Sequence, residues 1–312
     1  MALVRYFPIE PKLNFMGQRR WFLAISMVLL FGSLALFLTR GLNYGVDFTG
    51  GIVMEVQTEG PADLDGLRNR LNGLGLGDVQ LQSFGTPDVV LINLPRQDGG
   101  EEAQQQAIEK VEAALGADAK EYRRVEAVGP KVGDELRTGA LVATILAMAG
   151  IAIYVWVRYD LNFAIAALIS LLHDVAAVIG FLAITGYEFN LTTMAAVLTV
   201  AGYSINDTVV IYDRVREELR RYKKAPIEEV LNRAINATLS RTTLTSLTTV
   251  MALLAIFLFG GDVLEGFSAG IIVGIVVGTY SSWGVAVPLL SLTRLRPRLS
   301  AAEPETKPGK AG

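Results

Sequence analysis

Long apolar runs separated by polar segments dominate the sequence. Six of them approach or reach the about 20 mostly apolar residues that a helix needs to cross a bilayer, and they cover residues 21–38, 140–157, 161–184, 191–212, 244–259 and 267–290. The first run has two interpretations. A signal peptide has an apolar core of about 7–15 residues, whereas this run is longer and more spans follow it. The pattern therefore predicts a polytopic α-helical membrane protein with six transmembrane helices, the first of them uncleaved.

Residues 40–137 form a polar insert between the first two spans, with a different periodicity. Alternating apolar positions predict strands at 52–58, 79–84, 89–94 and 121–128, and leucine or alanine spacing predicts helices at 62–72 and 101–115. The order βαββαβ is that of a ferredoxin-like split βαβ domain.

These patterns divide the chain into four parts. We expect an N-terminal segment with the first span at 1–39, an α+β domain at 40–137, five further spans at 138–295 with a polar loop at 213–243, and a disordered tail at 296–312. An apolar stripe in the loop, at positions 227–235, predicts a separate short helix. That helix would either lie on the membrane surface, the interpretation we favour, or pack under the bundle.

Composition supports a membrane protein and excludes several kinds of chemistry. The 312 residues are 51% hydrophobic and 19% charged, with a mean hydropathy of +0.39. The chain has no cysteine and one histidine, which excludes disulfides, thiolate chemistry and a histidine-rich metal site. We expect no cofactor, no metal and no nucleic-acid partner.

Charge predicts the orientation. Lysine and arginine gather before the first span, in the loop 214–241 and after residue 293, while the short loops 185–190 and 260–266 have none. By the positive-inside rule the N- and C-termini are cytoplasmic and the α+β domain is extracytoplasmic.

Asp207 is the main candidate for chemistry, because it lies within the fourth apolar run beside Asn206. An ionisable side chain at this depth costs about 2.5–3.5 kcal/mol on insertion scales and is by default a functional candidate. Two interpretations are open: the helix ends early and leaves Asp207 in water, or Asp207 is buried. Burial favours the protonated carboxyl, and a nearby cation favours the ionised one.

Arg241, just before the fifth span, is the candidate cation. It either reaches Asp207 or extends to the membrane interface. Many hydroxyl residues surround it, and Thr245, one turn further, is the one expected on the Asp207 side. A carboxyl whose cation approaches and withdraws would bind and release a proton, so Asp207, Arg241 and Thr245 form the predicted proton-translocation site.

Two further features lie in the spans. His173 and Asp174 sit near the middle of the third span, as a proton relay or, the interpretation we favour, as a mutually satisfied buried pair. In the last span small residues recur every four positions, which allows close approach of another helix. They are Gly266, Gly270, Gly274, Gly278 and Ser282.

Five short stretches carry a resemblance to a known family. They are VDFTGG at 46–51, GPKVG at 129–133, His173-Asp174, GYSINDTVVIYDR at 202–214, and SRTT with TS at 240–246. In this order the chain resembles the SecF branch of the SecD/SecF family, which is similar to half of an RND-type transporter.

The resemblance implies a non-enzymatic subunit of the bacterial inner membrane that uses the proton-motive force to promote preprotein export. It implies SecD, the SecYEG translocon, a YajC-like subunit, unfolded preprotein and the lipid bilayer as partners. It implies Asp207 as the proton-carrying carboxylate and Arg241 as its partner. Asp47 lies in a family motif, where a role in a turn and a role in coupling are equally plausible.

Three other functions are open. A proton-coupled exporter of small molecules would need a larger outer domain with an apolar pocket. An intramembrane aspartyl protease would need Asp174 and Asp207 in carboxyl–carboxyl contact. A passive assembly factor would not need the charge of Asp207.

Overall fold

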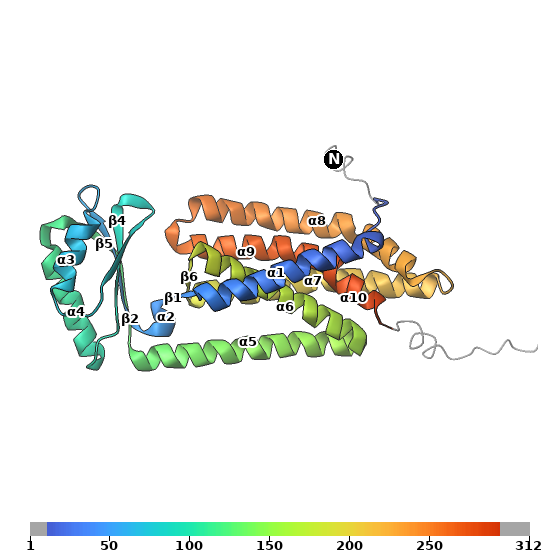
Figure 1. Cartoon of the computed structure of the whole chain (residues 1–312), viewed down its shortest axis with the longest axis horizontal. Helices are drawn as coiled ribbons and strands as arrows, with labels where there is room; N and C mark the ends of the chain where they lie inside the picture. The colour runs from blue at the N-terminus through green and yellow to red at the C-terminus, as the bar shows by residue number, and fades with distance from the viewer. Residues whose placement is uncertain (1–10, 294–312) are drawn as a thin grey trace, which may run out of the picture.

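The computed structural model describes residues 11–293 and consists of a helical bundle and a small sheet domain at one end of it (Figure 1). Six helices in the described residues are long and apolar enough to cross a membrane, which confirms the predicted multi-pass architecture. Their bounds are Arg19–Arg40 (α1), Pro130–Arg158 (α5), Leu161–Thr185 (α6), Leu191–Arg221 (α7), Ile227–Phe259 (α8) and Asp262–Ser281 (α9). A π turn, Ser282–Ala286 (η4), and the short helix Val287–Ser291 (α10) continue α9. The tail predicted at 296–312 lies outside the described residues.

The sheet domain has the predicted element order. Its elements are Gly51–Thr58 (β2), Leu64–Asn72 (α3), Gln80–Phe84 (β3), Thr86–Leu94 (β4), Gly100–Leu115 (α4) with the short turn Gly116–Asp118 (η3), and Ala119–Val128 (β5). The strands lie in the order β3-β4-β2-β5, and all neighbours are antiparallel. Helices α3 and α4 cover the face of the sheet that points away from the bundle (Figure 1). The apolar core therefore lies between these helices and the sheet.

A short junction connects the domain to the bundle. Its elements are Asn43–Tyr44 (β1), Val46–Thr49 (α2) and Glu188–Phe189 (β6). Strand β1 pairs in parallel with β6, directly before α7. Gly51 opens β2 with φ of 131°, and a Cβ atom there would lie 2.6 Å from the Leu94 carbonyl oxygen. This position therefore requires glycine.

Two helices differ from the prediction. Helix α5 begins at Pro130, ten residues before the expected apolar run. The stripe expected in a separate surface helix belongs to α8, which is one helix from residue 227 to 259. No glycine or proline interrupts that segment, so nothing in the sequence stops the helix.

The stripe residues Val230, Leu231, Ala234 and Ile235 are 0% exposed. They pack in the core that also contains Tyr212 and Val215 of α7. The favoured placement on the membrane surface is therefore wrong, because the end of α7 already offers an apolar surface to cover.

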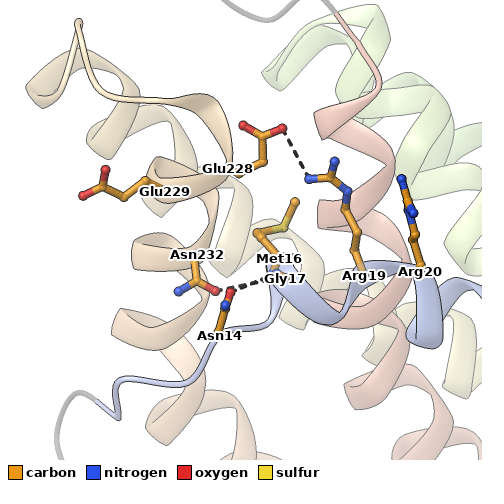
Figure 2. A pocket seen from close by; sticks show the side chains of 8 residues that line it. All are labelled: Asn14, Met16, Gly17, Arg19, Arg20, Glu228, Glu229 and Asn232. Atoms are coloured by element: carbon orange, nitrogen blue, oxygen red, sulfur yellow. Dashed lines mark hydrogen bonds and ion pairs between the residues drawn. The ribbon is translucent and has the colours of Figure 1, made fainter.

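The first described residues are fixed against α8 by two asparagines. Asn232 Oδ1 accepts hydrogen bonds from the backbone N–H groups of Phe15 and Met16 at 2.8 and 3.3 Å. Asn236 binds both backbone groups of Leu13, accepting from its N–H and donating to its carbonyl. Figure 2 shows the adjoining cavity, which Asn232 also lines.

Candidate functional site

Asp207 is buried inside the bundle. It is 2% exposed and follows the start of α7 by 16 residues, or about 24 Å at 1.5 Å per residue. Asp213, six residues further, is exposed and forms an ion pair with Arg158 at 3.0 Å. Asp207 thus lies about 9 Å short of the level where α7 meets exposed charges. The interpretation in which the helix ends early and leaves Asp207 in water is wrong.

Ser246 of α8 is the residue that meets Asp207. Its Oγ donates a hydrogen bond to Asp207 Oδ2 at 3.3 Å and shares a second one with Thr279 Oγ1 of α9 at 2.6 Å. A carboxylate with a hydroxyl donor and no bound cation has little to offset the cost of burying its charge. Hydroxyl groups are therefore what offsets the burial of this carboxyl among the described residues.

Among residues 11–293 neither Arg241 nor Thr245 is bonded to Asp207, although Arg241 lies near enough to act on its carboxyl electrostatically. Both are on an exposed side of α8, and Thr245 Oγ1 donates to the Arg241 carbonyl oxygen at 3.0 Å. Within residues 11–293 the Arg241 guanidinium forms no ion pair with Asp207. The sequence favoured Thr245 over Ser246, two residues about 100° apart on the helix. The rotation of α8 is set by its buried side chains, and it selects Ser246.

Four consecutive residues of α9 and η4 carry hydroxyl groups, and each reaches a different neighbouring helix. Thr279 binds Ser246 of α8. Tyr280 Oη donates to the Phe22 carbonyl oxygen of α1 at 2.6 Å. Ser281 Oγ donates to Asp174 Oδ2 of α6 at 2.7 Å, and Ser282 Oγ pairs with Thr208 Oγ1 of α7 at 2.9 Å. We call residues 279–282 the hydroxyl hub.

His173 and Asp174 form the buried pair favoured from the sequence, but the pair is not self-contained. Asp174 is 0% exposed and His173 3%, and Nδ1 of the imidazole lies 2.9 Å from Asp174 Oδ1. The other carboxylate oxygen accepts from Ser204 and Ser281. Asp174 and Asp207 therefore do not form the carboxyl–carboxyl contact that an aspartyl protease requires.

The remaining candidates lie away from this buried cluster. Asn206 is exposed on α7. Asp47 is at the junction, where its Oδ2 accepts a hydrogen bond from the backbone N–H of Leu191 at 2.8 Å. Asp47 thus satisfies one of the free N–H groups in the first turn of α7.

A second charged cluster surrounds the junction, outside the spans. Burial raises the pKa of Glu188 in β6, the nearby Arg124 of β5 opposes this shift, and Asp47 and Glu126 add to it. Arg124 itself binds Glu126, which raises the pKa of the guanidinium.

Sequence reasoning missed the residues that satisfy the two acids, namely Ser204, Ser246, Thr279 and Ser281. The available signal was the run Thr279-Tyr280-Ser281-Ser282 inside an apolar helix. Hydroxyl residues are common in membrane helices because they can bind their own backbone. The run alone could not show which of them reach across to another helix.

Comparison with known proteins places the chain in a family. Residues 107–296 match the model for the C-terminal part of the protein export membrane proteins SecD/SecF, and residues 35–62 match the SecD/SecF GG motif. The protein translocase subunit SecF of Calditerrivibrio nitroreducens is 44% identical over 289 residues, which cover 91% of this chain and 95% of that protein. The corresponding subunit of Magnetococcus marinus is 45% identical over 283 residues, covering 89% and 91%.

Solved structures agree with this placement. The crystal structure of SecDF, a translocon-associated membrane protein from Thermus thermophilus, matches with a TM-score of 0.83 and 36% identity over 91% of this chain. A second SecDF structure, in a super-membrane-facing form, has a TM-score of 0.68 over 95% of the chain. The chain spans only 39% and 40% of these two longer proteins.

The fold and these matches define a membrane protein of protein export. The chain belongs to the SecD/SecF family, and its role is that of an accessory subunit in Sec translocation.

Proposed function

We propose that this chain uses the proton-motive force, together with a SecD partner, to promote the export of preproteins through the Sec translocon. Asp207 is the proton-binding group, and Arg241 is the cation that displaces its proton. The observation that carries the proposal is the burial of Asp207, which is 2% exposed and bound by Ser246 instead of a cation.

In the proposed switch, the arrangement with Ser246 bound to Asp207 is the protonated state. When Arg241 approaches, its charge favours the ionised carboxylate, and the proton leaves. If water reaches the two states from opposite sides of the membrane, each cycle moves one proton. The membrane potential then supplies about 2.3 kcal/mol per charge per 100 mV, which can bias a conformational change by more than an order of magnitude.

The exposed side of α8 carries polar residues, which supports contact with another protein subunit on this side. Arg241, Thr245 and Thr248 follow one another at helical spacing and are all exposed. An arginine in contact with lipid is costly, whereas the exposed sides of α1 and α5 carry large apolar residues that suit lipid. The polar stripe is therefore where we place SecD. The SecYEG translocon, a YajC-like subunit and unfolded preprotein complete the proposed assembly, in the inner membrane with cytoplasmic termini and the sheet domain outside.

The test compares D207N with D213N in preprotein export and in proton flux across energised vesicles. Asp213 lies on the same helix but is exposed, so D213N controls for the loss of a carboxylate. We expect D207N to abolish the part of export that depends on the proton gradient and D213N to retain it. Full gradient-dependent export by D207N would refute the proposal and favour a passive assembly factor. Proton flux that responds to small amphipathic compounds while export is unchanged would favour a small-molecule exporter.

A further inference from the structure

The mechanism above leaves a second buried acid without a use. Asp174 lies 13 residues after the start of α6 and 11 before its end, or about 20 and 17 Å from the two ends. It is 0% exposed. Its carboxylate oxygens accept from Ser204, Ser281 and the neighbouring imidazole. Such an acid, far from both membrane surfaces, needs an electrostatic partner.

His173 is the basic group that binds Asp174, and one of its ring nitrogens is unused. Nδ1 is engaged with the carboxylate, while Nε2 is buried and has no hydrogen-bond partner among the described residues. An unsatisfied buried polar atom costs about 1–3 kcal/mol and calls for an explanation. With Nδ1–H donating to Asp174, Nε2 carries a free lone pair, which is the position for one additional proton.

The hydroxyl hub and α7 connect this pair to Asp207. Ser281 binds Asp174, and Thr279, two residues earlier, binds Ser246 at Asp207. On α7, Ser204 binds Asp174 and lies three residues before Asp207. Helices α7 and α9 therefore both carry residues that connect Asp174 with the surroundings of Asp207. The π turn that follows Ser281 is a further irregularity of a kind that often occurs at functional sites.

Few other ionisable groups face the pair. The helices packed against α6 are α1, α5, α7, α9 with its continuation η4, and α10. Neither η4 nor α10 contains an ionisable residue. From α7 the ionisable group is Asp207, and from α9 it is Tyr280, whose ring centroid lies 6.5 Å from that of His173. Tyr280 is bound to Phe22 and Ser26 of α1, and α5 has only the exposed Tyr154 within its apolar run.

We propose that His173 and Asp174 form a second proton-binding site whose occupancy is coupled to that of Asp207. A proton adds to the Nε2 lone pair of His173, and the resulting imidazolium keeps its Nδ1–H bond to Asp174, so the pair becomes neutral overall. Release reverses this step, and no other bond changes. The coupling rests on the proton-driven function proposed above, because it requires Asp207 to change its charge.

The single histidine makes a direct test possible. The full chain, labelled with 15N-histidine, purified through a histidine-free tag and placed in lipid nanodiscs, gives the two ring-nitrogen signals of one residue. We expect the Nε2 signal to change from that of a free lone pair to that of a protonated nitrogen as the pH is lowered. We expect D207N to lower the midpoint of this change, because Asp207 carries a negative charge that favours the imidazolium once it has released its proton, whereas D207N stays neutral. D213N should leave the midpoint unchanged.

The expected shift is roughly 1 pH unit where Asp207 is ionised. The two acids differ in depth by about 7 Å and lie on neighbouring helices whose axes are about 9 Å apart, which gives a separation of about 11–12 Å. One charge at that distance in an effective dielectric constant of about 20 corresponds to this shift. D174N, which removes the bound carboxylate, should lower the midpoint further.

An imidazole that does not titrate, or one whose midpoint is the same in wild type and D207N, would overturn the inference. It would then be a structural pair. This readout is independent of export. Loss of proton flux in D207N with an unresponsive histidine would leave the proposed function intact, whereas a coupled histidine with normal gradient-dependent export would refute the function instead.

Discussion

Replacing Gly274 by alanine tests the contact between the two helices that hold Asp207 and the hydroxyl hub. A Cβ atom at position 274 would lie 2.2, 2.6 and 2.9 Å from Cγ2, Cγ1 and Cβ of Val200 in α7. Real Cβ atoms do not come within 3.0 Å of other heavy atoms, so something has to move. This contact also identifies the partner of the glycine ridge, which lies within the same chain.

Val200 cannot clear the space by changing its rotamer. Valine in a helix has one strongly preferred χ1 rotamer, and its Cβ, which does not move on rotation, is already too close. Val200 is also 0% exposed, so it cannot move out into solvent. The two helices must therefore separate slightly, and overpacking of this kind costs about 1–3 kcal/mol.

Gly270 provides the matched control, because it lies one turn earlier on the same ridge. Its added Cβ would meet Val178 Cγ1 at 3.9 Å and Ala196 Cβ at 4.0 Å, which is ordinary contact. Both substitutions gain the same helix propensity, about 1 kcal/mol for glycine to alanine. That gain cancels in the comparison, so G274A should be less stable than G270A by about 1–3 kcal/mol.

The assay is reversible unfolding in mixed micelles with increasing mole fraction of SDS, followed by circular dichroism. We expect G274A to unfold first and G270A to match or exceed the wild type. The double variant V200A/G274A should lose less stability than the sum of the two single variants, because alanine at 200 removes the clashing methyl groups. Equal stability of G274A and G270A would refute the packing argument.

Three further predictions concern the junction and the N-terminal segment. D47A should lower the free energy of unfolding by about 1 kcal/mol through loss of the hydrogen bond to Leu191 N–H, whereas D47N, which retains an acceptor oxygen, should lose less in the same SDS titration. Burial raises the pKa of Glu188. Its contribution to stability is therefore fully present below the pKa of the unfolded chain, near 4.5, and is lost as pH rises through the pKa of the folded protein. E188Q should exceed the wild type in stability at pH 8 and not at pH 4. N232A should destabilise the protein by about 1–3 kcal/mol by leaving the backbone N–H groups of Phe15 and Met16 unsatisfied, with faster amide hydrogen exchange at residues 15 and 16 as the second measurement.

The fold was largely predictable because each element has its own periodicity. Spans are identified by length and hydropathy, and the strands and helices of the insert by spacing. Helix α8 shows the limit of this reasoning. Its polar half, from 227 to about 240, has no apolar run to mark it as part of a span, so a local pattern divides one helix into two. Only the buried stripe at Val230, Leu231, Ala234 and Ile235 shows that the helix continues under the bundle.

The sequence predicted the kind of site, a buried acid, but not which residues bind that acid. The burial of Asp207 follows from the apolar residues on both sides of it, which is local information. The choice of Ser246 over Thr245 depends on the rotation of α8 about its axis, which is fixed by packing against α7 and α9. The sequence shows that α9 carries hydroxyl groups, but it does not show which neighbouring helices these groups face. Tertiary packing therefore decides which polar groups become partners.

The junction and the buried acid are connected by one uninterrupted element. Strand β1 of the junction precedes the sheet domain in the chain and pairs with β6. Asp47, which follows β1, binds the first turn of α7. From that turn α7 continues without a break through Asp207 to Arg221. A helix with complete hydrogen bonding and no proline or π turn resists bending, so its two ends move together. Because Gly274 seats α9 directly on α7, the hydroxyl hub is held against the same helix. A displacement of the sheet domain that shifts β6 must therefore act on the part of the bundle that holds both acids.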